Sequence, residues 1–152
     1  MAASTFSTVD ELKAAVGSHL GYSEWWEITQ ERVNRFADAT DDHQFIHVDP
    51  DRAAQSPFGG PIAHGYLTLS MAVPLAQQIV SVEGVRMAVN YGTNKVRFPA
   101  PVPVGSKLRA GAVLRSVEDV PGGVQVVYEL TFEVEGGEKP VCVAETVSRY
   151  YL

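Results

Sequence analysis

An alternation of apolar and polar residues near the C-terminal end constrains the fold of this chain more than any other feature. Apolar side chains occupy every second position over residues 124–134. Successive side chains of a strand point to opposite faces of a sheet, so this pattern predicts a half-buried β-strand. Turn-forming pairs, Gly122-Gly123 and Gly136-Gly137, bound the strand, and residues 108–114 and 141–151 predict its neighbours. An antiparallel sheet of this kind needs another element to cover its apolar face.

The segment at residues 66–80 is predicted to be that cover. It is apolar on nearly every side, so it predicts a helix of about fifteen residues that is buried rather than exposed. The chain is therefore expected to form an α+β fold, with an antiparallel sheet around one buried helix. No repeat or linker divides the chain, and we predict one domain over residues 1–152.

Capping residues predict three shorter helices in the first half of the chain. Thr8 caps a helix over residues 8–16, Thr29 caps one that runs to about Ala39, and Asp49-Pro50 opens one that ends near Ala54.

Two further segments are predicted to be strands. Residues 22–28 are rich in aromatic side chains, and residues 85–98 alternate with a change of phase at Gly92. A glycine at such a change of phase indicates a β-bulge.

Charge and composition exclude several classes of partner. With 12 Lys and Arg against 18 Asp and Glu, the net charge is −6, which disfavours binding of nucleic acid through phosphate contacts. Polar residues interrupt the longest apolar segment, so we expect no membrane span. The first sixteen residues lack the basic and apolar regions of a signal peptide. The single cysteine, Cys142, lies in a strand pattern as a core residue. A cytoplasmic location is therefore expected.

The polar stretch at residues 40–50 carries the candidate chemistry. His43 and His47 lie there among Asp41, Asp42 and Asp49. The spacings typical of zinc sites are absent, so we predict no metal. A carboxylate and an imidazole that share one water can perform acid–base chemistry, and a loop can bring Asp42 and His47 to one point. A solvated loop with Asp caps is the alternative.

Gly65 is a second candidate, because it stands where the predicted buried helix begins. The first N–H groups of a helix have no intrahelical acceptor, and they can bind a carbonyl or an oxyanion. Alternatively, the glycine only allows close packing between helix and sheet. The motifs of serine hydrolases, dinucleotide-binding proteins and P-loop proteins are all absent.

Taken together, residues 36–49, Ala53-Ala54 and residues 61–67 resemble the MaoC-like family of (R)-specific enoyl-CoA hydratases. The family's motif has the form [ST]-G-D-x-N-P-[IL]-H and falls at about residues 36–54 here. The resemblance extends from about Ile28 to the C-terminus. It implies a hot-dog fold, in which an antiparallel sheet wraps a long central helix.

The resemblance also implies roles for individual residues. Asp42 and His47 match the catalytic pair, and Gly65 matches the glycine whose N–H binds the thioester oxygen. Gln44 stands where the family usually has Asn, Phe45 replaces the usual Pro, and Asp41 the usual Gly.

A serine of some members falls at about Val73, and Ser70 is the substitute that we predict one turn earlier. Arg86, Lys95 and Arg97 are candidates for the phosphates of coenzyme A, with a solvated strand face as the alternative interpretation.

The implied activity is syn addition of water to trans-2-enoyl thioesters, or the reverse dehydration of (R)-3-hydroxyacyl thioesters. Coenzyme A or acyl carrier protein would enter as part of the substrate, with no separate cofactor. The acyl chain is expected in an apolar slot between helix and sheet, and the expected assembly is a homodimer. Two alternatives remain: a hot-dog acyl-CoA thioesterase, and a non-catalytic acyl-thioester-binding subunit.

Overall fold

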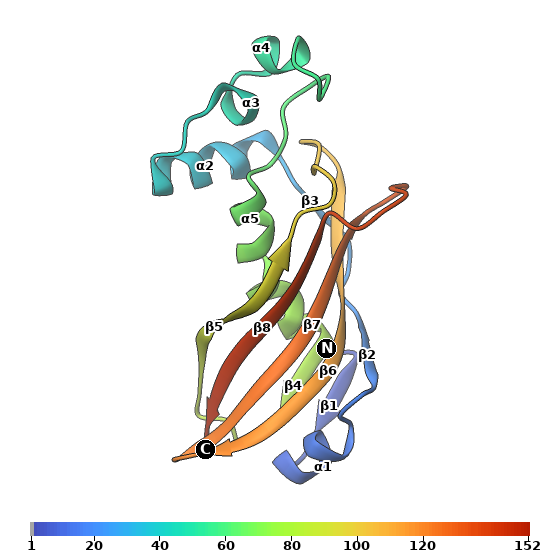
Figure 1. The fold of residues 1–152 in the computed structure, drawn as a ribbon, viewed down its shortest axis with the longest axis vertical. Coiled ribbons are helices and arrows are strands. Elements are labelled where there is room, and N and C mark those ends of the chain that lie inside the picture. The colour runs from blue at the N-terminus through green and yellow to red at the C-terminus, as the bar shows by residue number, and fades with distance from the viewer. Residues whose placement is uncertain (1) are drawn as a thin grey trace.

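In the computed structural model, which describes residues 2–152, six strands form one antiparallel sheet (Figure 1). Its strand order is β2-β6-β7-β8-β5, and β3 also pairs with β6. The strands are β2 (His19–Tyr22), β3 (Trp26–Glu27), β5 (Met87–Arg97), β6 (Lys107–Val120), β7 (Gly123–Val134) and β8 (Cys142–Tyr151). A separate pair, β1 (Ser4–Phe6) and β4 (Val80–Val82), is parallel.

The helices lie in three places around this sheet. Figure 1 shows α1 at the end of the molecule near the C-terminus, α5 along the sheet, and α2, α3 and α4 together at the opposite end. Their bounds are α1 (Val9–Ala14), α2 (Gln30–Thr40), α3 (Phe45–Val48), α4 (Pro50–Ala54), α5 (Gly65–Ser70) and α6 (Ala72–Ile79).

The strand predicted from the alternation is confirmed as β7. Its inward side chains are almost completely buried: Val124, Val126, Tyr128, Leu130 and Phe132. Each buried side chain of this size contributes about 1.5–3 kcal/mol to folding. The predicted caps are confirmed as well, because the side chains of Thr8, Thr29 and Asp49 each accept a hydrogen bond from a backbone N–H of the first helical turn. The fold is the expected sheet around a helix.

The predicted continuous helix is wrong, because the segment forms two helices, α5 and α6, that meet at Met71. Pro74 explains the break, since it has no N–H to donate to the Ser70 carbonyl and its ring crowds that carbonyl. Complete burial is wrong too. Leu75 and Ile79 are fully buried, but the side chains of Tyr66 and Val73 are 72% and 43% exposed.

The aromatic segment at residues 22–28 forms the ends of two short strands rather than one strand. The chain leaves the sheet between Tyr22 and Trp26, where a serine side chain replaces part of the ladder. The Ser23 N–H donates to the Ala110 carbonyl, and the Ser23 hydroxyl accepts from the Ala110 N–H.

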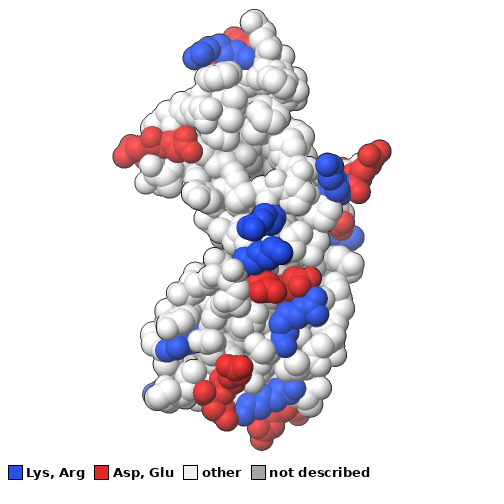
Figure 2. Space-filling model, in the orientation of Figure 1, with Lys and Arg blue, Asp and Glu red and all other residues white. Residues whose placement is uncertain are grey.

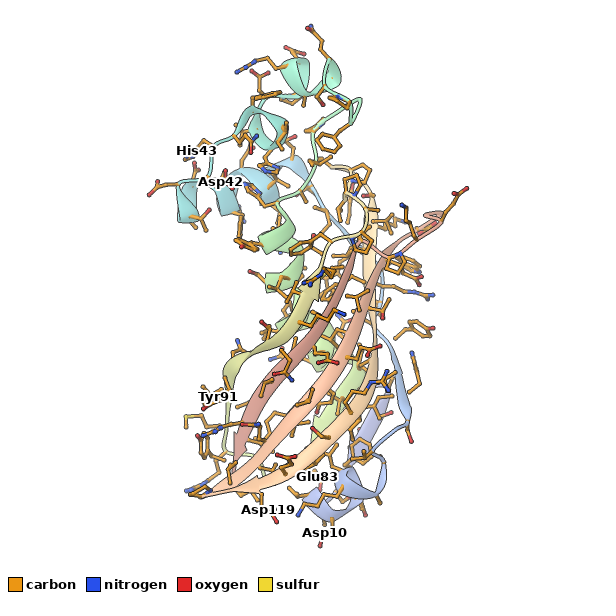
Figure 3. The ribbon with its side chains drawn as sticks, viewed as in Figure 1. Asp10, Asp42, His43, Glu83, Tyr91 and Asp119 are labelled. Atoms are coloured by element: carbon orange, nitrogen blue, oxygen red, sulfur yellow. The ribbon has the colours of Figure 1, made fainter. Side chains whose placement is uncertain are left out.

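Strand β5 forms the edge of the sheet and differs from its prediction in burial. The bulge is present, because the pairing with β8 shifts between Asn90 and Gly92. The alternating apolar side chains Met87, Val89 and Tyr91 are nevertheless 39–59% exposed. Figure 3 shows Tyr91 at the outer edge of this strand. The apolar side chains of this predicted strand are therefore uncovered within one chain.

Across residues 2–152, we find no helix with the length and hydropathy needed to cross a membrane.

The turn between β6 and β7 offers a stability test. A Cβ added at Gly123 would lie 1.8 Å from the Tyr150 carbonyl oxygen on β8, whereas a Cβ at Gly60 meets nothing within 4 Å. Gly123→Ala should therefore cost at least about 2 kcal/mol of unfolding free energy, and Gly60→Ala less than about 0.5 kcal/mol. Urea unfolding measures both. Equal stability of the two variants would contradict the placement of β8 against this turn.

Candidate active site

The end of α2 turns the chain into the candidate site. Asp41 follows the helix with φ 60° and ψ 24°, the left-handed conformation that usually favours glycine. Aspartate is one of the few other residues that visit this region, which explains how Asp41 replaces the glycine of the family motif. Asp42 comes next, and Figure 3 shows it exposed at the connection between α2 and α3.

A short helix, α3, holds His47 in place. The Gln30 side-chain amide on α2 donates to the His47 carbonyl oxygen at 2.8 Å, and the His47 N–H donates to the Gln44 carbonyl oxygen at 3.0 Å. The His47 side chain is buried, with 6% exposed.

One hydrogen bond determines which nitrogen of His47 is available for chemistry. His47 Nδ1 lies 2.7 Å from the Ile62 carbonyl oxygen. A carbonyl oxygen only accepts hydrogen bonds, so Nδ1 carries the proton in this bond. In the neutral ring, Nε2 therefore keeps its lone pair and can accept a proton.

The segment that contains Ile62 is itself fixed on both sides. The Ile62 N–H donates to the Ile46 carbonyl on α3, and Ala63 and Val104 form further backbone bonds with Val102 and Pro61. This segment leads directly into Gly65, the first residue of α5. The same few residues therefore orient His47 and position the start of the helix.

Gly65 has both of the properties predicted for it. A Cβ there would lie 3.3 Å from the Phe98 ring, so the glycine allows close packing. Its N–H is also the first of α5, where no intrahelical acceptor exists. Because α5 has only six residues before the break, the N–H itself, rather than the dipole of a long helix, is the feature of interest.

His64 is part of the site, although the sequence did not identify it as a functional residue. Its ring stacks on the His47 ring with centroids 3.9 Å apart, and its Nε2 donates to the Asp42 carbonyl oxygen at 3.0 Å. Burial lowers the pKa of His64, partly opposed by this hydrogen bond. His64 is therefore a neutral ring that connects Asp42 to His47, and its position next to Gly65 was the signal available.

Asp42, His47 and His64 form one cluster, in which one ligand-type atom of each lies within 4.8 Å of the others. The structure thus brings the predicted pair together. The three residues are also the candidate ligands for a metal. However, the lone pairs of two stacked imidazoles lie in nearly parallel planes and do not converge on one ion. The arrangement suits a shared water better than a shared metal.

Two hollows meet at this cluster. One is the acid–base pocket, lined by Asp42, His47, His64, Gly65, Tyr66 and Phe98. The other is an apolar cavity of about 350 Å³ that reaches His47 and Gly65 from the side of Phe58 and the loop at residues 98–102.

Two adjoining cavities form a groove along α5 and α6. Helical spacing recurs within each helix among the side chains of Tyr66, Leu69 and Ser70 on α5, and of Val73, Ala76 and Gln77 on α6. Tyr66 borders the acid–base pocket, and the other five line two adjoining cavities of about 390 and 130 Å³ against β5 and β8. The groove lies between helix and sheet, where the sequence predicts an apolar slot, but the polar residues Ser70, Asn90, Thr93 and Thr146 also line it.

The supporting residues predicted for the site lie at different distances from it. The Gln44 N–H donates weakly to the Asp42 carboxylate, at 3.4 Å. The Ser70 hydroxyl instead donates to the Tyr66 carbonyl of its own helix and lies in the groove. The structure therefore does not bring Ser70 to the Asp42–His47 pair.

The predicted phosphate-binding residues are not among those that line the pocket or the cavity. Lys95 and Arg97 lie beside Glu129 and Glu145 in a separate hollow. Figure 2 shows basic and acidic side chains next to one another on this face of the sheet. Arg86 precedes β5, about 35 Å from Arg97 at the ~3.3 Å rise of a strand, so within one chain it is far from the site.

Comparison with known proteins gives consistent relatives. The family model for a MaoC like domain matches residues 11–135. A 3-hydroxyacyl-thioester dehydratase Z of Mycobacterium tuberculosis (strain ATCC 25618 / H37Rv) is 58% identical over 147 residues, which cover 96% of this chain and 97% of the relative.

Solved structures share the architecture. A monoamine oxidase regulatory protein from Archaeoglobus fulgius aligns with a TM-score of 0.78 at 25% identity, covering 100% of this chain and 99% of that one. An (R)-hydratase from A. caviae involved in PHA biosynthesis aligns with a TM-score of 0.69 at 24% identity, covering 88% and 94%. This second likeness shows the fold.

The buried His64 predicts an acid-sensitive stability. The pKa of His64 is lowered from 6.5 in the folded chain, so below pH 6.5 the unfolded state binds more protons than the folded state. The unfolding free energy therefore decreases as the pH decreases. Above that range both states hold a neutral ring, and this contribution is constant. His64→Gln should therefore show a flatter decrease of unfolding free energy between about pH 6.5 and pH 5 in urea titrations. An equally steep decrease in both proteins would contradict a buried neutral His64.

Proposed function

The chain belongs to the MaoC-like domain family, and on that premise we propose that it is an (R)-specific hydro-lyase of a single domain. It adds water to trans-2-enoyl thioesters, or removes water from (R)-3-hydroxyacyl thioesters. The 58% identity to a 3-hydroxyacyl-thioester dehydratase supports the reaction class. The observation that carries the proposal is the cluster of Asp42 and His47 beside the first N–H of α5.

His47 Nε2 is the proposed base for water. The bond from Nδ1 to the Ile62 carbonyl leaves Nε2 as the nitrogen with a lone pair. Asp42 would hold the same water through its carboxylate. In hydration, the hydroxyl adds to C3, and the proton taken from water passes through the pair to C2. Both groups act from one face of the double bond, which gives syn addition.

The Gly65 N–H is the proposed donor to the thioester oxygen. Negative charge develops on this oxygen when the hydroxyl adds to C3, and a donor already in place stabilises it without reorganisation. Because Gly65 is one residue from His64 and three from Ile62, the donor and the base are held by the same backbone segment.

The two arms of a thioester leave its carbonyl in opposite directions. The apolar cavity near Phe58 reaches Gly65, and the groove begins at Leu69, about one helical turn after Gly65. We assign the acyl chain to the groove along α5 and α6, and the carrier arm to the apolar cavity near Phe58. Coenzyme A or acyl carrier protein would thus enter as part of the substrate, and the chain's own groups supply the acid–base chemistry with no separate cofactor. Lys95 and Arg97 are kept as weak candidates for the carrier phosphates, since Glu129 and Glu145 lie beside them.

A homodimer is proposed from the uncovered edge of the sheet. Strand β5 leaves a row of backbone groups unpaired and exposes Met87, Val89 and Tyr91. Edges of this kind are usually blunted or covered, and a second copy of β5 would cover this one.

We keep the cytoplasm as the proposed location. Cys142 is buried, and burial raises the pKa of its thiol to about 11. A lone thiol of this kind needs no oxidising compartment.

Removal of either proposed acid–base group should abolish turnover without loss of the fold. Asp42→Asn and His47→Gln should each lower kcat about 10²–10⁴-fold in the hydration of crotonyl-CoA, followed by loss of the enoyl absorbance. Asp38→Asn and His43→Gln are matched controls, because these residues form an exposed pair nearby in the chain, with Asp38 on α2 and His43 in the connection that follows it. Unchanged kcat in the Asp42 and His47 variants, or an equal loss in the controls, would contradict the site.

The same assay separates the alternative functions. Release of free thiol from a saturated acyl-CoA would identify a thioesterase, and tight binding with no turnover of either substrate would identify a non-catalytic subunit.

A substitution on the edge strand β5 tests the proposed homodimer. Val89→Asp places a charge at the proposed dimer contact, so this variant should sediment as a single chain while wild type sediments as a dimer. Val16→Asp is the control, because Val16 is similarly exposed but lies near α1. A dimeric Val89→Asp protein would contradict the proposed interface.

A further inference from the structure

The far end of the groove along α5 and α6 is closed by two tyrosines. Tyr128 on β7 and Tyr150 on β8 both line the inner cavity, together with Ala76 and Val80. Their hydroxyl oxygens are 2.8 Å apart, and Tyr128 is 3% exposed. Other polar residues line the same cavity, namely Gln77, Asn90, Thr146 and Ser148, but among its polar residues Tyr128 is the buried one. We call its hydroxyl pair with Tyr150 the floor of the groove.

Counting hydrogens shows that this floor has one donor to spare. Burial raises the pKa of both hydroxyls, so each keeps its proton. The two O–H groups hold two hydrogens, and their mutual hydrogen bond uses one. Within residues 2–152, neither hydroxyl bonds to any other group. The second hydrogen has no acceptor among the described residues.

The hydroxyl pair lies at the end of the groove that only a long acyl chain would reach. Along the chain, Leu69 and Val73 follow Gly65 by four and eight residues and line the first part of the groove, whereas Ala76 follows it by eleven and lines the inner cavity. A short acyl tail would end in the first part of the groove, which Leu69 and Val73 line. A longer tail would extend into the inner cavity and place an alkyl group, which accepts no hydrogen bond, against the spare hydroxyl hydrogen.

On the basis of the proposed function, we propose that the Tyr128–Tyr150 hydroxyl pair sets the upper limit of acyl chain length in this enzyme. Each added CH₂ contributes about 0.8 kcal/mol, or roughly fourfold, while the tail is buried against apolar groups. That gain ends where an alkyl tail meets a buried donor that it cannot satisfy. The preferred substrates are therefore thioesters whose acyl chains are too short to reach the Tyr128–Tyr150 hydroxyl pair.

The double variant Tyr128→Phe, Tyr150→Phe tests this limit. It removes both hydroxyls together and keeps the shape of the cavity, so neither ring is left with an unpaired partner. Tyr151→Phe is the matched control, since Tyr151 is the next residue on β8 but does not line the groove. The measurement is kcat/KM for enoyl-CoA substrates from C4 to C16.

Wild type and Tyr151→Phe should show kcat/KM rising with length and then levelling or falling. The kcat/KM of the double variant should continue to rise with length, and its ratio of kcat/KM for the longest to that for the shortest substrate should be at least tenfold above the wild-type ratio. An identical length profile, or an equal loss at every length, would overturn the assignment.

Failure of the proposed function would look different. Wild type would then hydrate no enoyl thioester of any length. The role of the floor would still be decided by calorimetry of saturated acyl-CoA binding. Tighter binding of the long chains by the double variant supports it, and equal binding by the two proteins overturns it.

Discussion

The hydrogen bond from His47 Nδ1 to the Ile62 carbonyl is the interaction on which the rest of the site depends. It connects two segments fifteen residues apart in the chain, and the bond from the Ile62 N–H to Ile46 makes the connection reciprocal. With Nδ1 committed to a carbonyl, the chemistry of the ring is confined to Nε2. Gly65 follows three residues later, so a shift of Ile62 would move the proposed base and the proposed thioester-oxygen donor together.

The sheet explains why this segment is rigid enough for the task. Residues 61–63 pair with the loop after β5 through Pro103 and Val102, and that loop emerges from a strand held along its length by β8. The groups that we propose as catalytic therefore lie on short helices and loops whose backbone bonds lead back to the central strands. This arrangement is typical of sites in which a rigid scaffold positions functional loops. In the same arrangement, the edge strand β5 is left uncovered by the rest of the chain.

Features with a local physical cause could be predicted from the sequence. The alternation in β7 and the caps at Thr8, Thr29 and Asp49 depend on neighbouring residues and agree with the structure. The break in the central helix was also local, because Pro74 was visible, but the apolar run outweighed it in the prediction. The exposure of β5 and the distance of Arg86 from the site could not be foreseen, since both depend on how the strands are ordered. His64 was missed because nothing in its spacing shows that its ring stacks on His47.

The tautomer of His47 is the most direct test of this account. Long-range ¹H–¹⁵N correlation NMR on protein with ¹⁵N-labelled histidine distinguishes a protonated ring nitrogen from one with a lone pair. The account predicts that neutral His47 carries its proton on Nδ1 and that its Nε2 has the shift of an unprotonated nitrogen. A proton on Nε2 with an unprotonated Nδ1 would contradict it, because the bond to Ile62 could not then form.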